Sequence, residues 1–197
     1  MREVELKSVV GDVKAARDAL ERAGAELDFE GQLIDVRYAD TAGRMLLADH
    51  VLRLRVYASS SETIGHLDWK GPTRYEDGYK VREELSTTAG DPDALAQILA
   101  RMGYVIVRDI ERWIAQYKLH GATVRFEEYP RMDRLVEVEG SPEEIERAIA
   151  ALPLPRAGFT AERLADFVVK FEARTGERAA LSARELAGIY EYSPENA

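Results

Sequence analysis

The chain has 197 residues, 46% of them hydrophobic, so it can bury one sizeable core and has the composition of an ordinary globular protein. Its net charge of −9 argues against a general nucleic-acid-binding protein, because such proteins need an excess of Lys and Arg on the contacting surface. The lack of cysteine excludes disulfides and thiolate chemistry, and the lack of a signal peptide or of an apolar run of ~18 residues predicts a cytoplasmic protein with no membrane partner.

Alternating apolar and polar residues predict about eight strands. Several are joined by short turns that contain Gly, which favours antiparallel pairing. The expected strands are roughly residues 2–10, 32–38, 51–58, 64–70, 79–87, 104–118, 122–129 and 134–139.

Helical patterns lie between and after these strands. Asp12 precedes an apolar series that stops at Gly24, and Ser141 with Glu144 forms a capping box. Further helices are expected over 91–103, 160–176 and 182–192. We therefore expect an α+β fold, with one domain over residues 1–176 and a C-terminal helical tail over 177–197.

The first strand carries charge on one face. Glu3, Glu5 and Lys7 alternate with Val4 and Leu6, and a strand sends alternate side chains to opposite faces. The three charged groups therefore share one surface while the two apolar side chains face a core.

The same segregation recurs in later strands. Apolar residues alternate there with Arg53 and Arg55, with Asp68 and Lys70, with Lys80, Arg82 and Glu84, with Arg125 and Glu127, and with Glu137 and Glu139. A one-sided antiparallel sheet would simply show such a face to water. If the sheet instead closes into a barrel, the charges point inward and need water, ions or a charged ligand. Clustered carboxylates favour Mg²⁺ or Mn²⁺, and clustered Arg and Lys favour phosphate, so a polyphosphate with metal ions fits both groups.

Six ordered segments between residue 2 and about residue 176 resemble the motifs of the CYTH superfamily, the triphosphate tunnel metalloenzymes. These are "EVELK", "QLIDVRYADT", "LRLR", "LDWKGP", "VREE" and "FEEYPRMDRLVEVEG". The resemblance implies an eight-stranded antiparallel β-barrel, the triphosphate tunnel, with helices packed outside. It also implies a small-molecule triphosphate as the binding partner and Mg²⁺ or Mn²⁺ as the cofactor.

The resemblance also assigns roles by position. It implies that Glu5 and Lys7 are catalytic and that Glu84 is a further acid of the tunnel. The expected metal carboxylates are Glu3, Glu5, Glu127, Glu137 and Glu139. The expected phosphate ligands are Lys7, Arg53, Arg55, Lys70, Arg82, Arg112 and Arg125.

Two positions depart from the family pattern. Glu127 stands where many members have Asp, which leaves the metal preference open. The sixth strand usually carries a Lys-x-Arg pair, but here Arg112 is followed by Ile114, so one cation is missing. Arg125, on the inward face two residues before Glu127, is the candidate to replace it.

The sequence favours hydrolysis of inorganic triphosphate, thiamine triphosphate or a nucleoside triphosphate, because attack by water needs no base or ribose pocket. Two alternatives stay open: a class IV adenylyl cyclase that makes cyclic AMP and pyrophosphate from ATP, and a non-catalytic polyphosphate-binding module. The sequence is compatible with a homodimer and decides neither the oligomeric state nor the role of the tail.

Overall fold

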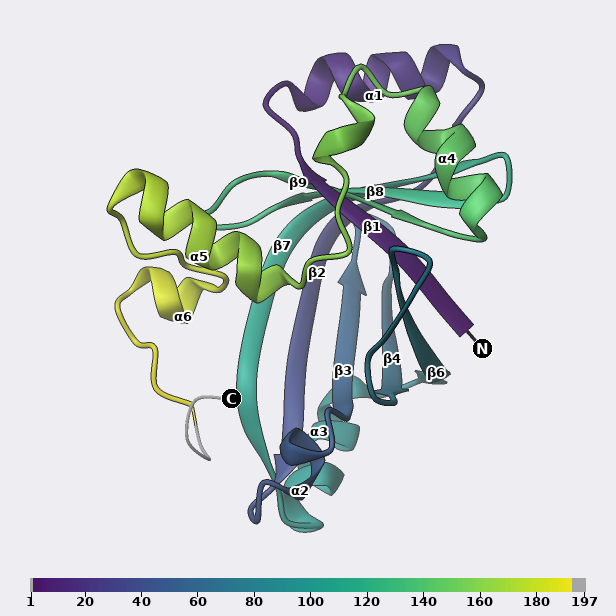
Figure 1. Cartoon of the computed structure of the whole chain (residues 1–197). Coiled ribbons are helices and arrows are strands. Elements are labelled where there is room, and N and C mark those ends of the chain that lie inside the picture. The colour runs from purple at the N-terminus through teal and green to yellow at the C-terminus, as the bar shows by residue number, and fades with distance from the viewer. Residues whose placement is uncertain (1, 193–197) are drawn as a thin grey trace.

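Eight strands of the computed structural model pair edge to edge in a closed antiparallel ring (Figure 1). In order around the ring they are β1 (Arg2–Val9), β9 (Leu135–Glu139), β8 (Ala122–Glu128), β7 (Tyr104–Leu119), β2 (Glu26–Asp40), β3 (Val51–Ala58), β4 (Thr63–Lys70) and β6 (Tyr79–Ala89). β6 then pairs with β1, which closes the barrel. A further short strand, β5 (Arg74–Glu76), pairs with β6 outside the ring. The predicted α+β barrel is confirmed.

The structure describes residues 2–192, and for Arg2 and Glu3 it describes only the backbone. In this part of the chain, the helices are α1 (Val13–Arg22), α2 (Arg44–Leu47), α3 (Pro92–Arg101), α4 (Pro142–Ala150), α5 (Leu164–Thr175) and α6 (Ala183–Leu186), with a 3₁₀ turn, η1 (Arg156–Gly158). None of these helices has the length and apolar character needed to cross a membrane.

Two helix starts follow the predicted capping signals. The Asp12 carboxylate accepts a hydrogen bond from the Ala15 backbone at 2.9 Å, and Ser141 forms the predicted capping box with Glu144. The helix expected from Thr160 instead begins at Leu164, because the backbone of Thr160 pairs with that of Lys7.

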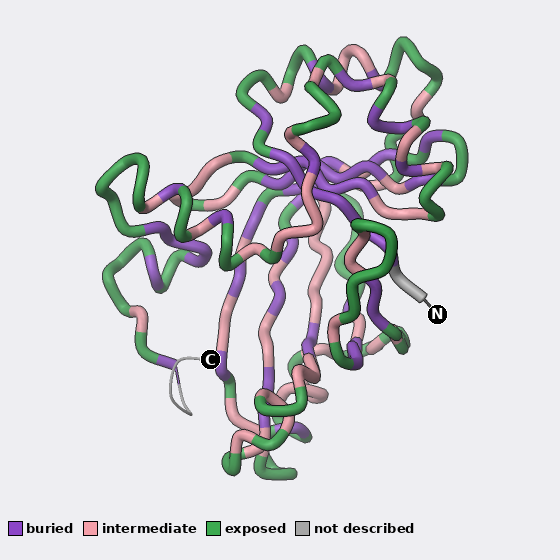
Figure 2. Tube along the Cα trace, viewed as in Figure 1, coloured by how far each residue is buried: buried purple, intermediate pink, exposed green. Residues whose placement is uncertain are grey.

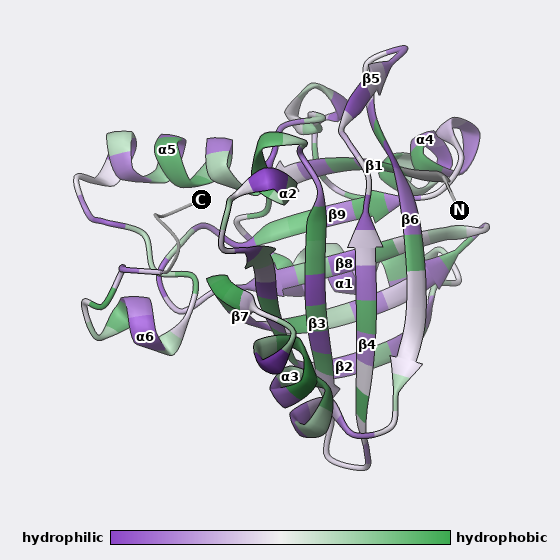
Figure 3. Cartoon of the chain, turned by 90° about the horizontal axis from the view of Figure 1, so that it is seen from below, coloured by the Kyte–Doolittle hydropathy of each residue, from purple (hydrophilic) through white to green (hydrophobic). Residues whose placement is uncertain are grey.

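The apolar faces of the strands point outward and are covered by the helices. On one side, α1 and α4 cover β1, β8 and β9, where Leu20 and Ile145 are fully buried (Figures 1 and 2). Burying each such side chain contributes about 1.5–3 kcal/mol. On the other side, Leu99 of α3 packs on Tyr38 and Leu54. With the apolar residues facing outward, the charged alternate positions face the interior, and Figure 3 shows this alternation as bands along β3.

The described part of the C-terminal segment lies against β7. The Glu111 backbone N–H donates to the Leu181 carbonyl at 2.7 Å, and Arg131 forms a backbone bridge with Ala180. Ala180 and Leu181 are almost completely buried, so residues 179–182 belong to the packed layer that covers the outside of the barrel.

Candidate active site

The barrel encloses a cavity of about 380 Å³ that is rich in charge. Ten Lys and Arg side chains line it against five carboxylates, although the whole chain has a net charge of −9. The cations are Lys7, Arg37, Arg53, Lys70, Lys80, Arg82, Arg108, Arg112, Arg125 and Arg163, and the carboxylates are Glu5, Asp35, Asp49, Glu127 and Glu137. The tunnel is therefore suited to a polyanion.

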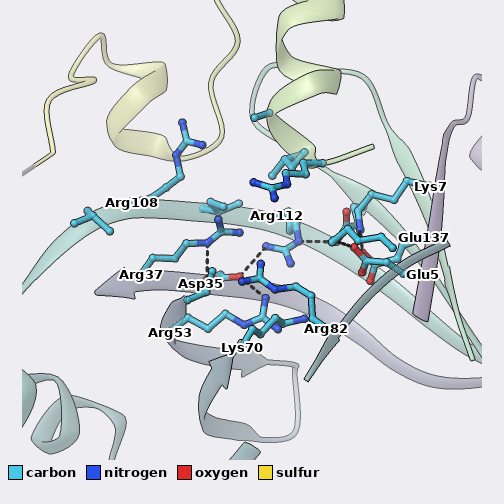
Figure 4. A pocket seen from close by; sticks show the side chains of 18 of the residues that line it. Glu5, Lys7, Asp35, Arg37, Arg53, Lys70, Arg82, Arg108, Arg112 and Glu137 are labelled. Atoms are coloured by element: carbon cyan, nitrogen blue, oxygen red, sulfur yellow. Dashed lines mark hydrogen bonds and ion pairs between the residues drawn. The ribbon is translucent and has the colours of Figure 1, made fainter. Parts of the chain in front are cut away.

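The acidic end of the cavity is built by β1 and β9. Lys7 donates a hydrogen bond to the Glu137 carboxylate, and its Nζ lies 3.2 Å from Oε1 of Glu5 (Figure 4). Lys80 of β6 contacts the same Glu5 oxygen. All three side chains of the Glu5–Lys7–Glu137 group are at least nine-tenths buried.

These contacts determine which groups are charged. Burial alone would raise the pKa of Glu5 and Glu137. The surrounding cations together outweigh it: Lys7, Lys80 and Lys70 hold the pKa of Glu5 well below its usual value, and Lys7 with Arg125 lowers that of Glu137 to about 2. Burial would likewise lower the pKa of Lys7, yet Glu137 and Glu5 together raise it above its usual value. Lys7 therefore stays protonated near neutral pH and can bind an anion but cannot act as a base.

The basic part of the cavity centres on Arg53 of β3. Its guanidinium donates to Asp68 at 3.1 Å, to Asp35 at 3.2 Å and to Glu84 at 3.4 Å. Nζ of Lys70 lies 3.3 Å from the same Glu84 side chain. Glu84 thus holds the cations of neighbouring strands in place.

Arg82 is held differently, by backbone oxygens. Its guanidinium donates to the carbonyl of Gly71 at 2.6 Å and to that of Asp49 at 2.5 Å. Nη2 of Arg82 also lies 3.8 Å from the Asp49 carboxylate, so the guanidinium is fixed at the wall of the cavity by two carbonyls and one ion pair.

Arg55 shares a strand face with Arg53 but does not line the cavity. Its Nε pairs with Asp68, and its Nη1 donates to the Tyr57 hydroxyl at 2.9 Å. Asp68 is fully buried, so it takes up much of the Arg55 charge. Arg53 and Arg55 thus share Asp68 and Glu84 as partners, and they differ in that Arg53 lines the cavity.

Glu127 and Arg112 form a buried pair on β8 and β7. Arg112 donates to Oε1 of Glu127 at 2.8 Å, and the Tyr129 hydroxyl donates to Oε2 at 2.7 Å. Burial and the Glu127 carboxylate raise the pKa of Tyr129 well above its usual value, so Tyr129 remains a donor. Both oxygens of Glu127 are thus already occupied by protein groups.

Arg125 points into the cavity, on the face that the sequence predicted. It donates to Glu137 at 2.8 Å and, through two nitrogens, to the Gln116 amide oxygen at 3.0 and 2.8 Å. Ile114, where the family has a cation, is fully buried and pairs across the sheet with Glu127.

Four of the five expected metal carboxylates have described side chains, and these four lie in different parts of the structure. Glu5 and Glu137 share the acidic end, and Glu127 lies in the same cavity with its own partners. Glu139 lines a separate hollow with Thr123 and Gly140. The side chain of Glu3 is outside the described residues, and its backbone pairs with that of Arg82.

The donor set at the acidic end fits a hard divalent cation. Glu5 and Glu137 approach the Lys7 ammonium from two sides, which shows that this point favours positive charge. In the described part of the chain, no group of three or more metal-binding side chains is present. Mg²⁺ commonly binds through one or two carboxylates together with substrate phosphates and water, so these two carboxylates are sufficient.

Six charged cavity residues and one tyrosine were missed as site residues in the sequence: Asp35, Arg37, Asp49, Lys80, Arg108, Arg163 and Tyr129. Three of them carried a readable signal, because Asp35 and Arg37 are two residues apart on an alternating strand and Lys80 shares the alternation of Arg82. Arg108 and Tyr129 carried none, since the first follows a strand irregularity and the second lies beyond the end of β8.

Comparison with solved structures finds the same fold in proteins of very different sequence. The chain matches the PH1819 protein of Pyrococcus horikoshii OT3 with a TM-score of 0.70 and 20% identity, over 85% of this chain and 98% of that one. It matches a candidate adenylate cyclase from Vibrio parahaemolyticus with a TM-score of 0.72 and 18% identity, over 85% and 97% of the two chains. The chain has the CYTH fold.

A third match is to a candidate adenylyl cyclase from Hippeastrum, described as having a dominant triphosphatase activity. Here the TM-score is 0.61 with 16% identity, over 91% of this chain and 99% of that one. No protein-family model and no curated protein matches the sequence. The structural matches are consistent with the CYTH resemblance of the sequence motifs, and at these identities they show the CYTH fold alone.

Proposed function

We propose that this CYTH-fold chain is a divalent-metal-dependent triphosphatase that binds its substrate inside the tunnel. The observation that carries the proposal is the cavity itself, with ten cations and five carboxylates in an acidic chain. A ligand of high negative charge is needed to neutralise it. The Hippeastrum protein, whose described activity is a triphosphatase, gives the proposal independent support.

In this proposal one group of cavity residues binds the phosphates and another binds the metal. Three cations on the adjacent strands β3, β4 and β6 would bind the phosphate chain: Arg53, Lys70 and Arg82. Glu5 and Glu137 would hold the metal, which when bound would supply a Lewis acid for the phosphoryl oxygens. Lys7, permanently protonated between them, would neutralise charge that builds up on the phosphate in the transition state.

Adenylyl cyclase activity is the second candidate, because the Vibrio and Hippeastrum proteins are both described as candidate cyclases. One feature of the cavity also favours it. Leu46, Val51, Val107, Ile110 and Leu164 give part of its wall an apolar surface that a nucleoside could contact.

Phosphorus NMR of the products separates these activities. The purified protein would be incubated with inorganic triphosphate, thiamine triphosphate and ATP, with Mg²⁺ and with Mn²⁺. Release of orthophosphate supports hydrolysis, and pyrophosphate with cyclic AMP from ATP supports cyclisation. Absence of turnover with every substrate and metal would contradict an enzyme and leave a polyphosphate-binding module.

A further inference from the structure

Arg37 of β2 and Arg108 of β7 lie directly opposite each other as cross-strand partners. Both side chains line the tunnel cavity. Like charges in this position repel, so an ordinary strand pair disfavours them. The triphosphate ligands expected from the family motifs include neither residue, so the proposed function does not account for the pair.

A β-bulge places Arg108 in the cavity. Arg37 pairs with Arg108 but the next residue, Tyr38, pairs with Ile106, so Val107 is an extra residue in β7. Neighbouring residues of a regular strand face opposite sides, yet Val107 and Arg108 both line the cavity. Bulges re-aim side chains in this way and are common next to active sites.

Buried polar atoms without hydrogen-bond partners, three donors and one acceptor, concentrate at this place. In the described part of the chain, four of seven buried side-chain polar atoms without a partner belong to one cluster. They are Nε of Arg37, Nε of Arg108, Nη1 of Arg112 and Oδ1 of Asp35. Figure 4 shows Asp35 between Arg37, Arg112 and Arg53. The Asp35 carboxylate lies 3.7, 4.0 and 3.2 Å from these three arginines. Arg53 and Arg112 also pair with Asp68 and Glu127, whereas among the described residues Arg37 has only the distant Asp35 carboxylate.

The neighbouring carboxylate of Glu185 already accepts hydrogen bonds from other groups. Glu185 of α6 lines an adjacent hollow together with Arg108. Its oxygens accept hydrogen bonds from the Leu181 backbone at 2.6 Å and from the Tyr192 hydroxyl at 3.3 Å. Arg37 and Arg108 therefore line the cavity with buried Nε groups that lack an acceptor among the described residues, and the planar guanidinium matches the oxygens of phosphate.

We propose that Arg37 and Arg108, together with Arg112, form an additional phosphate subsite on the β2–β7 side of the tunnel. The inference rests on the proposed function and extends it, because the cavity then takes a chain of four phosphates in preference to three. The fourth phosphate can belong to inorganic tetraphosphate or to a nucleoside tetraphosphate, since the subsite recognises the phosphoryl group alone.

Binding without turnover tests the subsite. Calorimetry in EDTA would measure dissociation constants for inorganic triphosphate, inorganic tetraphosphate and adenosine 5′-tetraphosphate. The native protein should bind at least one tetraphosphate about tenfold more tightly than triphosphate, as expected for one or two added charged hydrogen bonds. Arg37→Gln and Arg108→Gln should each reduce that ratio to about two.

Arg134→Gln is the matched control, because it removes the same charge outside the cavity. Arg134 is half-exposed and pairs with Glu128 at 3.3 Å. It should retain the native ratio, and a thermal melt of each variant confirms folding. Equal affinity of the native protein for tetraphosphates and triphosphate would overturn the subsite. So would an equal loss of both affinities in Arg37→Gln and Arg108→Gln, which would assign these arginines to the triphosphate site. Failure of every anion to bind would instead contradict the proposed function.

Discussion

Lys7 and Glu137 are cross-strand partners on β1 and β9, and the Lys7 ammonium donates a hydrogen bond to the Glu137 carboxylate inside the tunnel. Each side chain is only 9% exposed. Removing one partner would leave the other as a buried unpaired charge, which costs more than the intact pair contributes. This pair therefore links the stability of the barrel to the chemistry proposed for its acidic end.

Glu137→Gln should lower the free energy of unfolding at pH 7 by about 2–4 kcal/mol, because Lys7 and Arg125 both lose a charged partner. The pKa of Glu137 is lowered from 4.5 to about 2, so its contribution is complete above pH ~5 and is lost as the pH falls toward 2. Urea unfolding at pH 7, 5 and 3 measures this. A difference between native and variant protein that stays constant down to pH 3 would contradict the assignment.

Turnover should depend strictly on an added divalent metal, and EDTA should abolish it. Glu5→Gln should reduce kcat about a hundredfold or more and raise the Mg²⁺ concentration needed for half-maximal activity, since Glu5 is one of two converging carboxylates. Glu139→Gln is the comparison, because Glu139 is the cross-strand partner of Glu5 but lines a separate hollow, so its loss should have a smaller effect. Equal effects of the two variants would place Glu139 at the metal.

Arg53→Ala and Arg55→Ala should differ, although the sequence treats these residues alike. Arg53 lines the cavity, so its loss should raise KM for triphosphate and lower kcat. Arg55 does not line the cavity and pairs with Asp68 and Glu84, so its loss should mainly destabilise the fold, by about 3–5 kcal/mol. Arg53 shares both carboxylates, so its loss should lower stability as well as activity. Steady-state kinetics and urea unfolding of both variants distinguish the two effects, and a larger KM change in Arg55→Ala would contradict this division.

Much of the barrel could be predicted because side-chain alternation is a local property of a strand. Lys7, Arg53, Lys70 and Arg82 each alternate with apolar residues, and all four line the cavity. The capping residues of α1 and α4 were readable for the same reason, since a cap depends only on residues within one turn.

What depends on pairing between strands could not be read from the sequence. Arg55 has the alternation of Arg53, yet Arg53 lies opposite Asp68 and lines the cavity, whereas Arg55 lies opposite His66 and does not. The bulge at Val107, which admits Arg108, has no sequence signal either. The start of α5 was predicted too early because Thr160 pairs with Lys7, more than a hundred residues away in the chain.

Arg125→Ala should reduce kcat/KM for triphosphate about ten- to a hundredfold, because Arg125 points into the cavity and holds Glu137 at 2.8 Å. Arg125→Lys should recover part of the loss, since it keeps the charge but not the fork that also contacts Gln116. A purely structural role would lower the melting temperature of Arg125→Ala while kcat/KM stayed at the native value, and this result would contradict the prediction.

Asp109→Asn should stabilise the protein near neutral pH. Burial, with the nearby carboxylates of Glu111 and Glu185, raises the pKa of Asp109 from 3.8 to about 6, and its Oδ1 has no hydrogen-bond partner among the described residues. Folding therefore favours the protonated form, and above pH 6 the ionised carboxylate lowers stability.

The gain from Asp109→Asn should be about 1–3 kcal/mol at pH 7.5 and should shrink as the pH falls through 6 toward 4, because the native carboxyl then protonates. Glu111→Gln should give a smaller gain, since it removes one repelling neighbour but leaves Asp109 buried. Urea unfolding of both variants at pH 7.5, 6 and 4.5 measures these gains. A loss of stability in Asp109→Asn at pH 7.5 would mean that the Asp109 carboxylate makes a favourable contact against the C-terminal segment.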